Sequence, residues 1–158
     1  MRSALLFVLA LAFPLSAHAF DLTGTWEGKY TCKGFDGEKS SFTVPGTLEI
    51  TQTGTVLALA LPFDGGADAY NGVGIDDTAK PAQGAAYFVH CGVTDVPGMG
   101  EGGFDETGFA KVKTKENGTG SFKATTTYYL GAPREVATCK WSYKRIDTAD
   151  PVVPSCLP

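Results

Sequence analysis

The sequence predicts an all-β fold, a single eight-stranded antiparallel up-and-down β-barrel held by two disulfides. Helix signals are nearly absent, and 20 glycines separate short runs rich in Thr, Val, Tyr and Phe. Four cysteines, an even number, lie in a chain with features of an exported protein. The alternation in the first and last expected strands fits a register that places them side by side. That pairing favours a barrel over a sandwich.

A short leader opens the chain. Arg2 gives a positive start, residues 4–15 are an uncharged apolar run, and Ala17-His18-Ala19 is the small-x-small pattern that signal peptidase reads. The run is shorter than the roughly 20 apolar residues that cross a bilayer, and we expect no transmembrane segment in the mature chain. We therefore expect residues 1–19 to be a signal peptide and the mature protein to be secreted or periplasmic. The alternative is a retained N-terminal anchor.

The remaining 139 residues are enough for one domain with a real core. We expect the barrel domain over residues 20–148 and a C-terminal tail over residues 149–158. Without Arg2, 12 basic side chains stand against 17 acidic ones, a net charge of −5. Because the basic residues do not cluster in any segment of the sequence, we expect no nucleic-acid partner.

All four cysteines, Cys32, Cys91, Cys139 and Cys156, belong to the mature part. Two disulfides are expected, and the number of cysteines alone allows three pairings. Zinc binding is the rival interpretation, but the chain has no Cys-x-x-Cys pair, and His90 is its only histidine after residue 19. We expect no metal site.

The expected strands follow from short β-rich runs bounded by turn residues. They cover residues 22–33, 42–53, 55–61, 68–75, 84–91, 107–116, 120–130 and 134–146. In the fifth of these, alternation sets Ala86, Phe88 and His90 against Tyr87, Val89 and Cys91, and it leaves open which face is inside.

A test of the barrel comes from pairing the first strand with the last. Antiparallel pairing of Cys32 with Cys139 predicts a disulfide between them. It also sets inward residues against inward residues, with Tyr30 against Trp141, Gly28 against Tyr143 and Trp26 against Arg145. A slip of one residue would spoil every pair, because it turns one strand over.

The sequence predicts the turns and loops between the strands with less force than the pairing of the first and last strands. Thr53-Gly54 is expected to form a two-residue turn, and Asn117 to Thr119 a three-residue loop that pairs Val112 with Ala124. Residues 92–106 are glycine-rich, acidic and without periodicity. They are expected to form a long loop, which is either a functional lid or simply solvated.

The run Leu22-Thr-Gly24-Thr-Trp26-Glu-Gly28 resembles the opening strand of calycin-type barrels, the lipocalins, avidins and nitrobindin-like proteins. In lipocalins the tryptophan closes the barrel floor and stacks under an arginine from near the last strand. Arg145 is the matching residue here. The resemblance therefore implies that Trp26 and Arg145 are structural residues that stabilise the barrel.

The family's ligands do not carry over to this chain. Avidin-like proteins follow the same tryptophan with polar side chains that hold biotin, whereas Glu27 and Gly28 stand there. Nitrobindin-like proteins hold haem through a late histidine, and haem would here require His90 in mid-chain, so we expect no cofactor. A Cys91–Cys156 bridge, which we also expect, would tie the tail back across the barrel, as tails often are in lipocalins.

Six aromatic residues are the candidate ligand contacts. They are Tyr30, Phe88, Phe122, Tyr128, Trp141 and Tyr143. The alternative is that they only fill the core, because a narrow eight-stranded barrel can be packed solid.

Catalytic residues are not apparent. His90 is the only histidine after residue 19, and nothing in the sequence places a Ser or Thr beside it to form a nucleophile–His–carboxylate set. The acidic residues Asp64, Asp68 and Asp76-Asp77 match no calcium-loop spacing, and turn residues are the default interpretation. We expect no enzymatic activity.

The sequence thus favours an exported calycin-like barrel that binds a small apolar or amphipathic molecule at one open end, with residues 92–106 as a gate. The rival is a protein-binding or inhibitor module that uses loops on a solid barrel. A cavity lined by the six aromatic residues favours the first function, and a packed interior with an exposed apolar patch the second.

Overall fold

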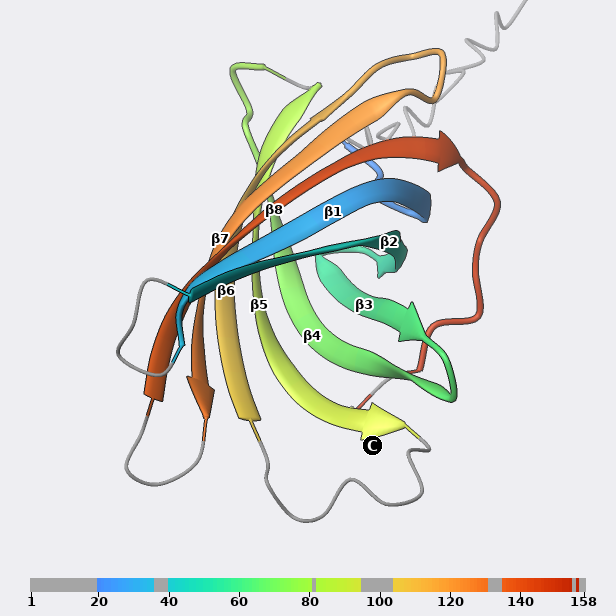
Figure 1. Ribbon diagram of the computed structural model, residues 1–158. Coiled ribbons are helices and arrows are strands. Elements are labelled where there is room, and N and C mark those ends of the chain that lie inside the picture. Colours follow the sequence, from blue (N-terminus) through green and yellow to red (C-terminus); the bar gives the residue numbers. More distant parts are fainter. Residues whose placement is uncertain are drawn as a thin grey trace, which may run out of the picture.

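The computed structural model is a closed antiparallel barrel of eight strands, as the sequence predicts (Figure 1). It describes residues 20–35, 40–80, 82–94, 104–130, 135–154 and 156; the expected signal peptide lies outside them. The strands are β1 (Gly24–Phe35), β2 (Ser40–Thr53), β3 (Val56–Phe63), β4 (Gly66–Asp76), β5 (Gln83–Thr94), β6 (Phe104–Thr114), β7 (Gly120–Leu130) and β8 (Glu135–Asp147).

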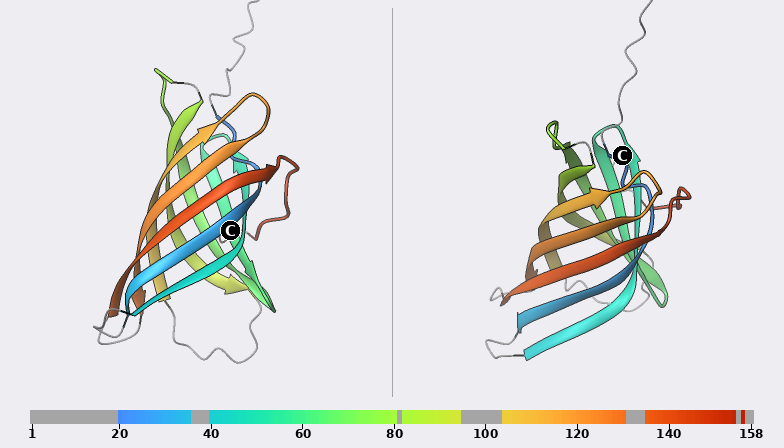
Figure 2. Two further views of the ribbon diagram at one scale, coloured as in Figure 1. Left: turned by 45° about the horizontal axis from the view of Figure 1, so that its top comes forward. Right: turned by 90° about the horizontal axis from the view of Figure 1, so that it is seen from above.

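Each strand pairs with the next one in the sequence, and β8 closes the barrel by pairing with β1 (Figures 1 and 2). The β1–β8 register has all four predicted pairs, namely Cys32 with Cys139, Tyr30 with Trp141, Gly28 with Tyr143 and Trp26 with Arg145. Closure leaves no free sheet edge, so all the strands have partners on both sides.

Two turns differ from the prediction. The β2–β3 turn is Gly54-Thr55 rather than Thr53-Gly54, because Thr53 pairs with Val56; Gly54 has a φ of 60°, which glycine adopts at little cost. The β6–β7 loop has five residues, 115–119, and pairs Val112 with Phe122 rather than Ala124. Both errors are shifts of two positions, so the predicted inward faces are still correct.

The expected loop over residues 92–106 is also shorter. Strand β5 continues to Thr94, and β6 begins at Phe104. Residues 95–103 lie outside the described part of the chain. Glu106 therefore belongs to a strand, where its side chain has a fixed direction.

One end of the barrel, which we call the Trp26 end, contains the β2–β3 and β6–β7 turns and is closed by the segment before β1. Phe20, Leu22 and Trp26 are at most 4 % exposed. The Trp26 indole N–H donates to the Leu22 carbonyl oxygen at 3.0 Å, and the Leu22 N–H donates to Gln52 Oε1 at 3.0 Å. These bonds hold the segment across the barrel floor.

The middle of the barrel is filled by aromatic rings. Phe88, Phe122, Trp141 and Tyr143 are each at most 2 % exposed. Phe88 lies 5.0 Å from Trp141 and 6.0 Å from Phe122 between ring centroids. Gly108 faces inward on β6, where a Cβ atom would collide with the Phe88 ring, so this glycine makes room for the ring.

The opposite end, which we call the Cys32 end, contains the Cys32–Cys139 disulfide between β1 and β8. A second disulfide joins Cys91 on β5 to Cys156, so both predicted bridges are confirmed. After β8, the tail returns along the outside of the barrel to reach Cys91 (Figure 1). Two disulfides indicate an oxidising environment outside the cytoplasm. Across the described residues, no helix is long and apolar enough to pass through a membrane.

Candidate functional site

The most unusual feature of the barrel interior is a buried carboxyl group at the Cys32 end. Glu106 is 4 % exposed. It accepts hydrogen bonds from the Tyr70 hydroxyl at 2.8 Å, from the Trp141 indole N–H at 3.3 Å and from the Thr126 hydroxyl. Burial raises the pKa of Glu106, while the three hydrogen bonds oppose that shift. A carboxylate that accepts three hydrogen bonds is well solvated by the protein even though water is excluded.

Alternation along β6 places Glu106 inside. Val112, Ala110 and Gly108 face the interior, and two residues further back on the same face is Glu106. Sequence reasoning missed this residue because it began the strand at residue 107. The signal was present nevertheless, since extending the strand by one residue places a carboxyl group inside the barrel.

A second carboxyl group, that of Asp68 on β4, lies nearer to solvent. Its side chain is 20 % exposed, and its Oδ1 atom is 3.9 Å from Nε2 of His90 on β5, which carries a charge only when protonated. Burial first, and the nearby Glu106 second, raise the pKa of Asp68 to about 6. The sequence suggested a turn residue here, but β4 begins at Gly66, so Asp68 is part of the inner wall.

Two tyrosines complete this layer. Tyr30 on β1 and Tyr128 on β7 are half-buried and pack against the core. Burial raises the pKa of Tyr30 to about 12, with smaller contributions from Asp68 and Glu106. The pKa of Tyr128 is raised by the same three causes. Both hydroxyl groups therefore lie in the field of both carboxyl groups.

Aromatic rings pack around the carboxyl groups. The Tyr70 ring centroid is 5.4 Å from that of Trp141 and 5.2 Å from that of His90, and Tyr30 is 6.2 Å from Trp141. We call this region the acidic chamber. It consists of Tyr30, Asp68, Tyr70, His90, Glu106, Thr126, Tyr128 and Trp141.

Permanent positive charge is absent from the chamber, as far as the described residues show. Arg145 lies at the Trp26 end, 4.7 Å over the Trp26 ring. The described lysines are exposed; they are Lys29, Lys33, Lys80, Lys111, Lys113, Lys115, Lys123, Lys140 and Lys144. No group of three or more metal-ligating side chains occurs among these same residues.

The six predicted ligand contacts are brought together, but at different depths. Phe88, Phe122 and Tyr143 are buried in the packed middle of the barrel. Tyr30 and Tyr128 belong to the half-buried layer, and Trp141 lies between the two layers, bonded to Glu106. Their part in binding remains a prediction.

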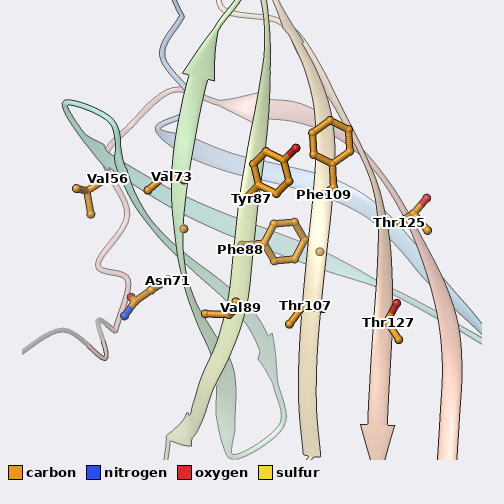
Figure 3. A pocket seen from close by; sticks show the side chains of 12 residues that line it. Val56, Asn71, Val73, Tyr87, Phe88, Val89, Thr107, Phe109, Thr125 and Thr127 are labelled. Atoms are coloured by element: carbon orange, nitrogen blue, oxygen red, sulfur yellow. The ribbon is translucent and has the colours of Figure 1, made fainter.

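A groove of about 750 Å³ lies on the outer surface of β4 to β7 (Figure 3). The rings of Tyr87 and Phe109 lie side by side in it, 4.8 Å apart between centroids (Figure 3). Val73, Tyr87 and Val89 are 47–51 % exposed. These side chains point away from the interior, so the outer groove and the acidic chamber are on opposite faces of the barrel wall.

No protein-family model, curated protein or solved structure matches this chain. The chemistry of the chamber follows from its own groups. It offers carboxylate oxygens, tyrosine hydroxyls and aromatic faces, which together accept hydrogen bonds and attract positive charge.

Proposed function

We propose that this protein is an exported, calycin-like binding protein that takes one small amphipathic molecule into the acidic chamber, and that it is not an enzyme. The apolar part of the molecule lies on the rings of Tyr70 and Trp141. Its polar part meets the carboxyl groups and the tyrosine hydroxyls.

The observation that carries this proposal is the contrast in burial along the barrel axis. The Trp26 end and the middle are sealed, with side chains at most a few per cent exposed. At the Cys32 end Asp68, Tyr30 and Tyr128 are only partly buried, and they lie above the buried Glu106. Concave sites with an apolar wall and a few convergent polar groups are the usual form of ligand sites.

Support for the calycin relationship comes from the Trp26 end. Arg145 stacks over Trp26, which is the arrangement that the resemblance implied, and it also donates to the carbonyl oxygen of Asp21. The two disulfides support secretion or export to the periplasm.

Native mass spectrometry of protein purified from its own source tests the proposal. We expect a co-purifying mass of a few hundred daltons, which denaturation releases. Protein that is free of such a mass and that binds none of a panel of uncharged and charged amphiphiles would contradict it.

A second candidate function, docking of a protein partner, is favoured by the packed middle of the barrel together with the exposed apolar side chains of the outer groove, the combination that the sequence analysis gives for this function. Besides its exposed apolar side chains, the groove wall contains Asn71, whose Oδ1 atom is buried and has no hydrogen-bond partner in the described part of the chain. A partner's N–H group would satisfy this oxygen. This function predicts a protein that co-purifies with the wild type and with Val136→Ser, another exposed site, but not with Tyr87→Ser.

A further inference from the structure

We propose that the ligand of the acidic chamber is an organic cation, an ammonium group on an apolar or aromatic body. This inference rests on the proposed function and specifies its ligand class. It depends on three properties of the chamber, which are its hydrogen-bond acceptors, its charge balance and its aromatic faces.

The first property is the hydrogen bonding of Glu106. All three neighbours donate to it, namely Tyr70, Thr126 and Trp141. An ionised carboxylate only accepts hydrogen bonds and has about four acceptor positions, so three donors leave room for one more. An ammonium N–H group is a donor that fits this remaining position, and its charge makes the hydrogen bond stronger.

The second property is charge. Glu106 and Asp68 lie in one chamber that, in the described residues, contains no Lys or Arg side chain. Burying a carboxylate without a positive partner is costly, and a second carboxylate nearby adds repulsion. A cationic ligand removes both penalties at once. An anionic ligand adds to them, and an uncharged ligand relieves neither.

The third property is the arrangement of rings. Tyr30 and Tyr70 pack against Trp141 beside the two carboxyl groups, with their ring centroids 6.2 and 5.4 Å from that of Trp141. The faces of aromatic rings attract cations, most strongly when water is excluded. Carboxylates together with aromatic faces favour an organic ammonium ion over a metal ion, since hard metal ions prefer a shell of oxygen ligands.

Binding of a cation also has a predictable pH dependence. The titratable groups that face Asp68 from the surrounding strands are Tyr30, Tyr70, His90, Glu106 and Tyr128. Burial and Glu106 hold the pKa of Asp68 at about 6 in the free protein. A bound cation lowers it, so the ligand competes with a proton. We expect the affinity to rise about tenfold between pH 5 and pH 7.5.

Isothermal titration calorimetry with 2-phenylethylamine and its uncharged counterpart 2-phenylethanol tests the inference at pH 7.5. We expect the amine to bind at least ten times more tightly. Glu106→Gln keeps the acceptor oxygen and removes the charge, so it should reduce this preference to less than threefold. Glu27→Gln, which removes an exposed carboxylate on β1, is the matched control and should keep the preference. Asp68→Asn, nearer to solvent, serves as the second variant if Glu106→Gln does not fold.

The outcomes separate this inference from the proposed function. If the alcohol binds as tightly as the amine, the charge preference is absent, and the inference fails while ligand binding in the chamber stands. If the amine is preferred but both Glu106→Gln and Asp68→Asn retain the preference, the chamber is not its site and the inference fails. If neither these probes nor the amphiphile panel binds, both proposals fail.

Discussion

The two ends of the barrel interior differ in the sign of their buried charge and in the groups that compensate it. At the Trp26 end the charge is positive and has partners. Arg145 stacks on Trp26 and donates to the carbonyl oxygen of Asp21. Burial lowers the pKa of Arg145, and the nearby Asp21 opposes the shift. At the Cys32 end the charge is negative. Glu106 accepts three hydrogen bonds, Asp68 lies 3.9 Å from Nε2 of His90, and the described residues place no permanent cation beside either carboxyl group.

The difference separates a structural use of buried charge from a functional one. A buried charge whose partners come from the chain itself has a structural use, because removing one partner leaves the charge uncompensated and destabilises the fold. Carboxyl groups that share one chamber without a cation reduce that stability, and such a cost is typical of binding and active sites. Four predictions test this contrast, from the largest expected effect to the smallest.

Trp26→Ala should lower the free energy of unfolding by about 3–5 kcal/mol, because it removes the large side chain that closes the barrel floor. Urea unfolding followed by circular dichroism measures the change. A loss below about 1 kcal/mol would show that the Trp26 end does not depend on this ring.

The double variant Cys32→Ala/Cys139→Ala should lower the free energy of unfolding by about 2–4 kcal/mol, since the bridge restricts the unfolded chain over a separation of 107 residues. Reduction of the wild type breaks both bridges, so the difference in stability between the double variant and the reduced wild type measures the contribution of the Cys91–Cys156 bridge. Equal stability of the variant and the oxidised wild type would contradict a structural role for the bridge at the Cys32 end.

Asp68→Asn should stabilise the protein by about 1–3 kcal/mol at pH 8. The pKa of Asp68 rises from 3.8 in the unfolded chain to about 6 in the folded one. Between these values the native state binds more protons, so the penalty grows as the pH rises and is complete above pH 6. The advantage of the variant should therefore disappear near pH 4. A variant less stable than the wild type at pH 8 would show that the Asp68 charge is already compensated.

Arg145→Lys should cost about 1 kcal/mol, because an ammonium group keeps the charge but does not reproduce the planar stacking on Trp26. Thermal unfolding measures the change in melting temperature. Lys144→Arg, at the exposed neighbouring position, is the control variant. Identical melting temperatures for Arg145→Lys and the wild type would mean that stacking adds nothing to this end.

The strand register and the two disulfides were predictable from the sequence, and the two buried carboxyl groups of the Cys32 end were not. Trp26, Cys139 and Arg145 lie on strands with clear alternation, and two long strands that must bury the same faces allow few registers. Turn positions were less certain, since a register shift of two residues preserves the same inward faces. The Gly54-Thr55 turn and the five-residue loop 115–119 show this.

The acidic chamber was missed because polar residues inside a barrel resemble loop residues in a sequence. Glu106 follows a glycine-rich stretch and was assigned to a loop, whereas Asp68, the first residue of an expected strand, was interpreted as a turn residue. Sequence alternation alone does not distinguish a solvated carboxylate from one that three strands surround with donors. Only the pairing of β6 with β7, and of β7 with β8, brings Thr126 and Trp141 to Glu106.

The central claim is that the two carboxyl groups of the chamber are completed by a cation from outside the barrel. The most direct measurement is a pH titration of the side-chain carboxyl ¹³C resonances of Asp68 and Glu106, with and without saturating 2-phenylethylamine. The account predicts that Asp68 titrates near pH 6 in the free protein and that both titrations move to lower pH when the amine is bound. Titrations that do not change with bound amine would contradict it.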